Sequence, residues 1–363
     1  MARRIMMFFL ISTLLLSMSI TVLASENAVS AGCIADKKED ETLLCEDDLM
    51  SALSDVEQQK ENIGLKDVDF QDLCIGNPIR TYIYVDDTFI ESYPMFPIME
   101  KDNLVLWAYE LNNSVQLTTG LVEKVNSNVS SAAPFAIIYD KDKAYLYCNE
   151  EFTLLAISPY ENNTRSVLDP YAKYEDSNIK LTSLDGTSSL NYLPTRSSTV
   201  YRLNVGFVSQ DLSSLGINRS NICWAAVTAS IVNYRTGQNL SAVNVAQRYY
   251  PPGNFNEPIE FSEFPDVLDL YNLNYTHNSY LPSDGVILEN IQAGYPIASG
   301  WGAPNYTNHA CTIYGTNPIS GYHYLMDPLT GFTTAVAGTN GYTYVSAANG
   351  ATYTFNNAAC NSW

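Results

Sequence analysis

Three residues in the second half of the chain could form a nucleophilic catalytic site. Cys223 starts an apolar run, and His309 and Asp327 follow it in that order. A thiol nucleophile needs a base that takes its proton, and the base needs a carboxylate that orients it. The order Cys, His, Asp supplies these three roles, so the chemistry that it indicates is acyl transfer at a carbonyl group. A structural, inert cysteine is the competing interpretation.

Cys223 is expected in the first turn of a buried helix. The polar Ser220 and Asn221 precede it, and an apolar run extends to Val232, with Gly237 near the expected end. The start of a helix offers unpaired backbone N–H groups and the positive end of the helix dipole, and both favour a thiolate. The position therefore predicts a reactive thiol.

His309 and Asp327 are expected on two neighbouring strands. His309 precedes the strand-like segment Ala310–Tyr314, and Asp327 ends the next such segment. A loop rich in Gly, Asn, Pro and Ser joins the two, so antiparallel pairing would bring His309, as the base, beside Asp327, as the orienting carboxylate. His323, in mid-strand between two tyrosines, competes for the role of base. His277 lies in a polar loop, where a surface role is the simpler interpretation.

An acyl-transfer site also needs donors to the developing oxyanion. The backbone N–H of Cys223 is one candidate. Gln210 is the candidate for the other, and Asn218 and Asn221 are alternatives that lie closer to the cysteine in sequence. Cys-x-x-Cys and His-x-x-x-His spacings are absent from the sequence, so neither a metal nor a cofactor is expected.

Taken together, these motifs resemble the papain-like cysteine peptidases. The shared features are a glutamine, Cys-Trp-Ala-Ala at a helix start, Asn-His-Ala before a strand and Asp-Pro after the next strand, all within residues 201–363. The pattern resembles in particular the compact bacterial branch: staphopain- and streptopain-like secreted proteases, bacteriocin-leader peptidases and related pathogen effectors. The resemblance implies a helical lobe and an antiparallel β lobe with the active site between them. Cys223, His309 and Asp327 would be the catalytic triad and Gln210 the oxyanion glutamine.

This sequence departs from the family pattern at two positions. Gln210 lies further before Cys223 than is usual in the family, and Asp327 stands where papain has an asparagine. Trp224 directly after the cysteine, and the 86 residues from Cys223 to His309, favour a peptidase over a transglutaminase-like acyl transferase. The remaining alternative is a catalytically inactive extracellular binding module with tyrosine- and asparagine-rich faces.

Helical patterns precede strand patterns in residues 201–363, which is the order of an α+β domain. The expected helices run from Cys223 to near Gly237, over Ser241–Arg248, over Ser262–Tyr271 and over Ser283–Ala293. The expected strands are Pro296–Trp301, Ala310–Tyr314, Tyr322–Met326, Phe332–Val336 and a hairpin at Asn349-Gly350.

Residues 25–160 are expected to form a β-rich, propeptide-like domain. The pattern predicts a short helix within Glu46–Gln59, hairpins over Tyr82–Ile90 and Ala136–Tyr147, strands at Leu104–Tyr109 and Phe152–Ile157, and a helical or mixed segment around Val115–Val125. This region has no histidine. By resemblance to staphopain-like zymogens, it would inhibit the peptidase domain, residues 201–363, until it is removed.

Residues 161–200 are expected to be a polar linker with the processing site at Thr195–Thr199. Residues 1–200 carry 30 acidic and 15 basic side chains, whereas residues 201–363 carry 9 and 4 and have no lysine. This shift in composition supports a domain boundary near residue 200. We expect a cut near Arg196 to free the inhibitory region by ending its tether.

The chain is expected to be secreted, and to be extracellular or bound at the cell surface. Arg3 and Arg4 precede the apolar Ile5–Leu23, and a small-residue cleavage site ends at Ala24, which is typical of a signal peptide over residues 1–24. A membrane anchor is the alternative, but we expect no stable membrane span after signal removal.

The expected partners are a protein or peptide substrate and the chain's own propeptide. A net charge of −20 speaks against nucleic acid. Seven cysteines leave one unpaired thiol if the others pair, which suits a free Cys223, and a Cys311–Cys360 disulfide is one pairing that the sequence allows. The predicted function is that of a secreted cysteine endopeptidase made as a zymogen, working through a thioacyl-enzyme intermediate.

Overall fold

The computed structural model describes most of the chain from residue 44 onward. The described ranges are 44–85, 87–141, 143–158, 168–169, 179–184, 187–190, 200–217, 220–251, 253–304 and 306–362. The expected signal peptide, the processing segment 195–199 and Asn218 lie outside them. In the described part of the chain, no helix is long and apolar enough to cross a membrane.

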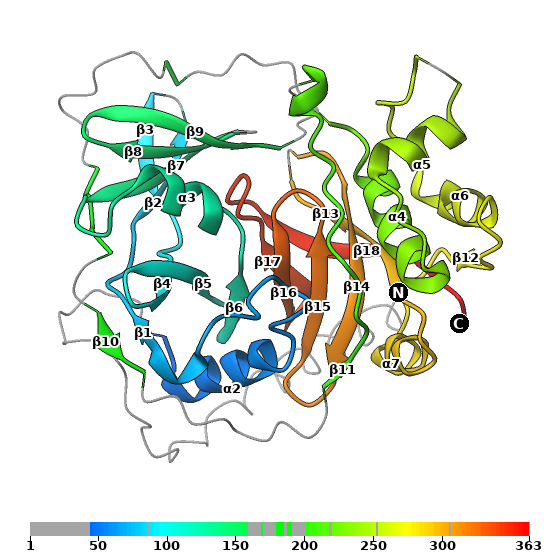
Figure 1. The fold of residues 1–363 in the computed structure, drawn as a ribbon, viewed down its shortest axis with the longest axis horizontal. Helices are drawn as coiled ribbons and strands as arrows, with labels where there is room; N and C mark the ends of the chain where they lie inside the picture. Colours follow the sequence, from blue (N-terminus) through cyan, green and yellow to red (C-terminus); the bar gives the residue numbers. More distant parts are fainter. Residues whose placement is uncertain are drawn as a thin grey trace, which may run out of the picture. The chain divides into compact units, whose positions relative to one another are not determined.

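Six antiparallel strands in the C-terminal half close into a barrel (Figure 1). Each strand pairs with the next along the chain, and the last pairs back onto the first. The interior is aromatic, with the Trp301 ring stacked on Phe355 at 5.0 Å between ring centroids. The strands are β13 (Ile297–Gly302), β14 (His309–Asn317), β15 (Tyr322–Asp327), β16 (Gly331–Gly338), β17 (Gly341–Val345) and β18 (Thr352–Cys360).

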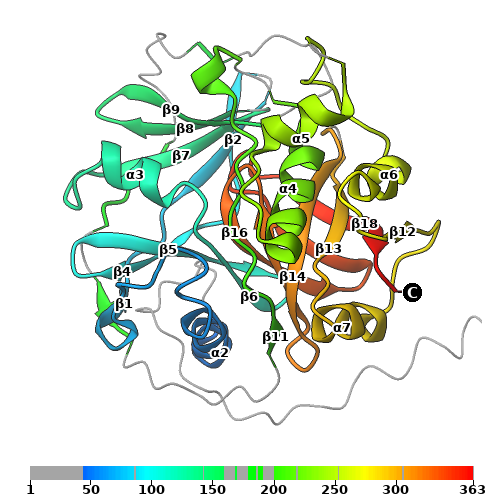
Figure 2. The same cartoon turned by 45° about the vertical axis from the view of Figure 1, so that its right-hand side comes forward.

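Four helices lie between residues 223 and 292, directly before the barrel in sequence, and together with it they confirm the α+β class. The central helix, α4 (Cys223–Thr236), is buried from Trp224 to Val232 and ends at Gly237, whose φ of 70° gives the left-handed conformation that glycine allows. It packs on β13 and β14 (Figure 2). The hydroxyls of Ser230 and Thr312 lie 2.7 Å apart in this contact. The other three are α5 (Ala242–Tyr249), α6 (Phe264–Asp269) and α7 (Asp284–Gln292).

The N-terminal region, as we call residues 44–158 together with 179–184 and 187–190, contains two groups of strands. One group extends the barrel sheet, and the other is a separate sheet in the order β3-β2-β7-β8-β9. Its elements are α2 (Glu46–Glu57), β1 (Leu73–Ile75), β2 (Thr81–Val85), β3 (Thr88–Glu91), β4 (Phe96–Glu100), β5 (Asn103–Leu111), β6 (Ser114–Thr118), α3 (Val122–Asn128), β7 (Phe135–Asp140), β8 (Lys143–Cys148), β9 (Glu151–Ile157) and β10 (Ser188–Ser189).

The predicted hairpins, strands and short helix of this region are confirmed. The segment predicted as helical or mixed contains both β6 and α3. Strands β1, β4 and β10 are additional strands that the pattern does not predict, and β10 lies within the segment 161–200 that was expected to be a linker. Short elements elsewhere are β11 (Tyr201–Arg202), β12 (Thr276–His277) and the 3₁₀ turns η1 (Phe70–Asp72), η2 (Ser213–Leu215) and η3 (Phe261–Glu263).

The sheet and the core continue across the expected domain boundary. Strand β6 pairs with β16 at Thr118 and Thr333, which joins β1, β4, β5 and β6 to the barrel in one sheet. A single hydrophobic cluster includes Leu53 and Trp107 from the N-terminal region and Tyr344 from the barrel. One core therefore spans the N-terminal region and the barrel, whereas α4, α5 and α6 pack in a second cluster.

The Cys311–Cys360 disulfide that the sequence allows does not form, and all six cysteines in the described residues are free. The reason is topological. Cys311 lies on β14 and Cys360 on β18, and β13 runs between these two strands. Strands two positions apart are separated by roughly 10 Å, which exceeds the reach of a disulfide.

Candidate active site

Cys223 is the first residue of α4, as predicted, and its side chain is half-buried. The helix start is held by Trp224, whose indole N–H donates to the carbonyl of Glu257 at 2.9 Å. The same ring packs edge-on against Tyr249 and Tyr250. The thiol thus lies at the positive end of a rigid, buried helix, where an anion is stabilised.

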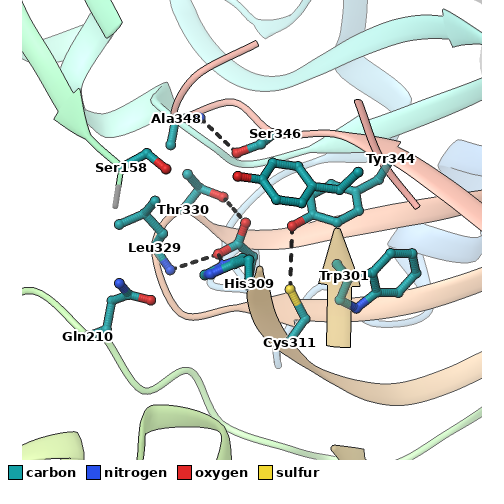
Figure 3. A network of polar contacts seen from close by, with 12 residues as sticks. Ser158, Gln210, Trp301, His309, Cys311, Leu329, Thr330, Tyr344, Ser346 and Ala348 are labelled. Carbon is teal, nitrogen blue, oxygen red and sulfur yellow. Dashed lines mark hydrogen bonds and ion pairs between the residues drawn. The ribbon is translucent and has the colours of Figure 1, made fainter. Parts of the chain in front are cut away.

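His309 and Asp327 lie side by side. The distance from His309 Nε2 to Asp327 Oδ1 is 2.8 Å, and both side chains are buried. Asp327 is itself held: its Oδ1 accepts from the backbone N–H of Leu329 at 2.8 Å, and its Oδ2 accepts from the hydroxyl of Thr330 at 3.1 Å (Figure 3). The predicted antiparallel pairing of their two strands accounts for this proximity. Because Nε2 faces the carboxylate, Nδ1 remains for the thiol.

The surroundings of His309 favour the imidazolium. Burial alone would lower the pKa of His309, but the Asp327 carboxylate beside it, helped by Cys311 and Cys223, holds this pKa well above its ordinary value. The contribution of Cys223 shows that its thiol lies within interaction range of the ring. The structure therefore brings together the three residues that the sequence singles out.

The other two histidines lie elsewhere. His323 is fully buried in β15, where its ring stacks on Tyr342 at 3.7 Å between centroids and its Nδ1 lies 3.1 Å from Thr316 Oγ1. It precedes Asp327 by four residues of one strand, which corresponds to about 13 Å. His277 is half-buried in β12, with Nε2 3.3 Å from Asn357 Oδ1.

Gln210 connects the two loops that carry the catalytic candidates. Its backbone N–H donates to the carbonyl of Pro328, next to Asp327, at 3.0 Å. Its side-chain Nε2 donates to the carbonyl of Ser220, three residues before Cys223, at 3.2 Å, and its Oε1 has no hydrogen-bond partner among the described residues. The amide lies near His309 and Leu329 (Figure 3). The second hydrogen of this buried amide has no partner among the described residues.

Asn221, an alternative oxyanion donor, is engaged elsewhere. Its side-chain Nδ2 donates to the carbonyl of Asn256 at 3.3 Å, and its backbone N–H donates to the Asn256 side chain at 2.9 Å. These bonds tie the segment before Cys223 to the loop between α5 and α6. Within the described residues, Gln210 is therefore the better placed of the two side chains.

A second thiol lies close to the candidate base. Cys311 is fully buried, and its sulfur lies 3.6 Å from the Tyr344 hydroxyl. Ligand atoms of His309, Cys311 and Asp327 all lie within 4.8 Å of one another, so the three could in principle hold a metal. Burial raises the pKa of the Cys311 thiol to about 11. His309 Nε2 and Asp327 Oδ1 already bind each other at 2.8 Å. The geometry fits an imidazole–carboxylate pair better than a metal site.

An aromatic layer supports His309, and sequence reasoning missed it. The Tyr353 ring lies edge-on to His309 at 6.2 Å and stacks on Tyr344 at 5.6 Å. Asn349 Nδ2 donates to the Tyr353 hydroxyl at 3.1 Å and to Ser158 Oγ at 3.0 Å. Ser158 directly follows β9, so the N-terminal region reaches the ring that packs against the base. The alternation of Thr352–Cys360 was the one signal that could have placed Tyr353 facing the barrel.

A cavity of about 860 Å³ lies next to Gln210 and is walled by both halves of the chain. The N-terminal region contributes Leu154–Ile157 of β9 and the segment from Leu121 to Lys124. Residues 200–362 contribute Phe207, Leu212, Ile217, Leu329 and Thr330. The lining is mainly apolar.

Residues 204–343 match a family model described as papain-like cysteine protease AvrRpt2. The match spans Gln210, Cys223, His309 and Asp327. No curated protein matches the chain. The narrower likeness to staphopain and streptopain stays a prediction. The family match supports the enzyme class that the site geometry indicates: the chain is a cysteine peptidase, and it is similar to papain-like cysteine proteases over residues 204–343.

Proposed function

We propose that the chain is a cysteine endopeptidase that works through Cys223, His309 and Asp327. The observation that carries this proposal is the 2.8 Å contact between His309 Nε2 and Asp327 Oδ1 beside the helix that starts at Cys223. A buried carboxylate fixes the ring and stabilises its positive charge, which is the role of the third member of a catalytic triad.

In this mechanism the Cys223 thiolate attacks the carbonyl carbon of the scissile peptide bond. The oxyanion that forms accepts hydrogen bonds from the Cys223 backbone N–H and from Gln210 Nε2. The His309 imidazolium gives its proton to the leaving amine as the C–N bond breaks, which leaves a thioester on Cys223. Water then attacks the thioester while His309 accepts its proton, and the acid product leaves with the thiolate regenerated.

We also propose that the chain is secreted and made as a zymogen in which the N-terminal region restrains the site. Support for restraint is the Ser158–Asn349 hydrogen bond next to Tyr353. Support for secretion is the charged and apolar pattern of residues 1–24. The processing site near Arg196 and the kinship with staphopain-like zymogens belong to the same proposal.

Peptide hydrolysis by matched variants tests the catalytic part. Cys223→Ala should abolish activity, and His309→Ala should be nearly as severe, while both keep the folded far-UV spectrum. Cys45→Ala is the matched control, because Cys45 is exposed and outside the site. A Cys223→Ala protein as active as the parent contradicts the proposal. The zymogen part is wrong if the intact chain hydrolyses peptide as fast as a chain cut between residues 191 and 199.

A further inference from the structure

We propose that the N-terminal region is a permanent part of the folded enzyme, so that a cut between residues 191 and 199 yields a two-chain enzyme and not a free peptidase domain. The sequence alone predicts dissociation after such a cut. We call the N-terminal region and residues 200–362 the two halves, and the contacts between them point to retention. Retention of the N-terminal region does not depend on the proposed function; only the statement about activation rests on it.

The first contact is made by Gln116 of β6, whose side chain is fully buried. Its Nε2 donates to the carbonyl of Val345 at 2.9 Å and to Thr333 Oγ1 at 3.1 Å, and its Oε1 accepts from the Val345 N–H at 2.8 Å. The amide therefore satisfies both backbone groups of the last residue of β17, as a neighbouring strand would. Without the N-terminal region, Val345 would have to find other partners for both groups.

Next to Gln116, the end of β6 is bonded to β16 along a continuous path. The Leu117 N–H donates to Thr334 Oγ1 at 3.0 Å, and the Thr118 hydroxyl donates to the carbonyl of Phe332 at 2.9 Å. The Thr119 N–H donates to the carbonyl of Phe332, and the Phe332 N–H donates to Thr119 Oγ1, both at 3.1 Å. These groups are buried or half-buried, so this part of the contact resembles the interior of a sheet.

The second contact is made by α2 and the turn after it with β14 and β15. Asp55 Oδ2 accepts from the Tyr324 hydroxyl at 2.5 Å and from Asn317 Nδ2 at 3.0 Å. Gln59 Oε1 accepts from the Tyr314 hydroxyl at 2.9 Å. All five side chains are buried. A buried carboxylate with two donors from the barrel is stable only while the two halves stay together.

The two halves also interlock in shape. A Cβ added at Gly350 would lie 2.5 Å from the Tyr139 ring, and one added at Gly120 would lie 2.4 Å from the Ala347 Cβ. Backbone in each half therefore packs directly against a side chain of the other. Such close packing, within one shared hydrophobic cluster, is typical of a protein interior and of obligate interfaces.

Activation then has to be local. Ser158 is the described residue of the N-terminal region that contacts the network beside His309, and it ends the stretch that leads into the linker. A cut between residues 191 and 199 breaks neither the Gln116 nor the Asp55 contacts, and the chain before the cut stays paired with the rest of the N-terminal region through Thr182 and Ser189. Any release of restraint is therefore confined to contacts near the cut and at Ser158, while the N-terminal region continues to wall the cavity.

The test uses the full chain with Cys223→Ala and a specific protease recognition sequence placed between residues 191 and 199. After complete cutting, confirmed on a denaturing gel, both fragments should elute together in native size-exclusion chromatography at about 1 μM, which requires a Kd well below that concentration. Fragments that elute separately overturn the proposal. A cut chain that retains Cys223 is assayed separately for peptide hydrolysis. Absence of hydrolysis would contradict the proposed function, whereas the elution result alone decides whether the N-terminal region is retained.

A second measurement needs no cut. Urea unfolding of the intact Cys223→Ala chain should be one cooperative transition by tryptophan fluorescence and far-UV circular dichroism, and two separated transitions would overturn the proposal. Gln116→Ala should lower the midpoint of the whole transition and reduce the folded-to-unfolded ratio by roughly tenfold or more. Thr343→Val is the matched control, because the bond from Asn112 Nδ2 to Thr343 Oγ1 that it removes also joins the two halves but is exposed. Equal effects of the two variants would count against a buried, core-like interface.

Discussion

Replacing Asp327 by asparagine should separate the orientation of His309 from its charge. The amide keeps the size of the carboxylate, but it removes a negative charge 2.8 Å from His309 Nε2. Two unit charges about 4 Å apart interact by about 4 kcal/mol at an effective dielectric constant of 20. If this interaction is lost in the charge-separated transition state, kcat should fall by about three orders of magnitude for Asp327→Asn.

The pH dependence gives the sharper test. Because Asp327 holds the pKa of His309 above its ordinary value, the imidazolium persists to alkaline pH and is lost as the pH rises through that pKa. In Asp327→Asn the alkaline limb of kcat should therefore move to lower pH. Thr330→Val is the control: it removes one hydrogen bond to Oδ2 but leaves the charge, so kcat should fall less than tenfold. An unshifted alkaline limb, or a kcat for Asp327→Asn within tenfold of the parent, refutes the reasoning.

Three further predictions follow from single contacts. Burial lowers the pKa of His323 to about 3, so between pH 3 and about pH 6.5 the imidazole is protonated in the unfolded chain but not in the folded one. The free energy of unfolding should therefore fall by about 1.4 kcal/mol for each pH unit of acidification in this window. His323→Gln should remove this pH dependence in urea titrations of the Cys223→Ala chain. Gln210→Ala should lower kcat by about 100-fold with little change in KM, because one donor to the oxyanion is lost. An unchanged kcat would show that Gln210 has no part in the mechanism. Gly350→Ala should destabilise the fold by about 1–3 kcal/mol because its Cβ meets the Tyr139 ring, whereas Gly253→Ala, also at positive φ but with open space, controls for backbone strain alone.

Local signals predicted the parts of the site that depend on short stretches of chain. Cys223 falls at a helix start because polar residues precede an apolar run, and His309 meets Asp327 because their strands follow one another through a short loop. The Gly237 helix end and the Ser241 cap follow from equally local rules.

Long-range pairing was beyond such reasoning. Thr118 and Thr333 pair across 215 residues, and no pattern in either segment names the other as its partner. The sharing of one core by the N-terminal region and the barrel was therefore not predicted. The absence of long-range information also explains why Tyr353 and Ser158 were not predicted near the site: they are 195 residues apart in sequence and are joined through Asn349. Cys311 and Cys360 looked like partners because sequence does not reveal that β13 lies between their strands.

The most direct test of the account is to find which sulfur carries the acyl group. A chain cut between residues 191 and 199 is mixed with a slowly hydrolysed peptide ester, quenched in acid and digested, and the fragments are measured by mass spectrometry. The account predicts a thioester on the fragment that contains Cys223, absent in Cys223→Ala and retained in Cys45→Ala. An acyl group on Cys311, or ester hydrolysis that continues in Cys223→Ala, would contradict it.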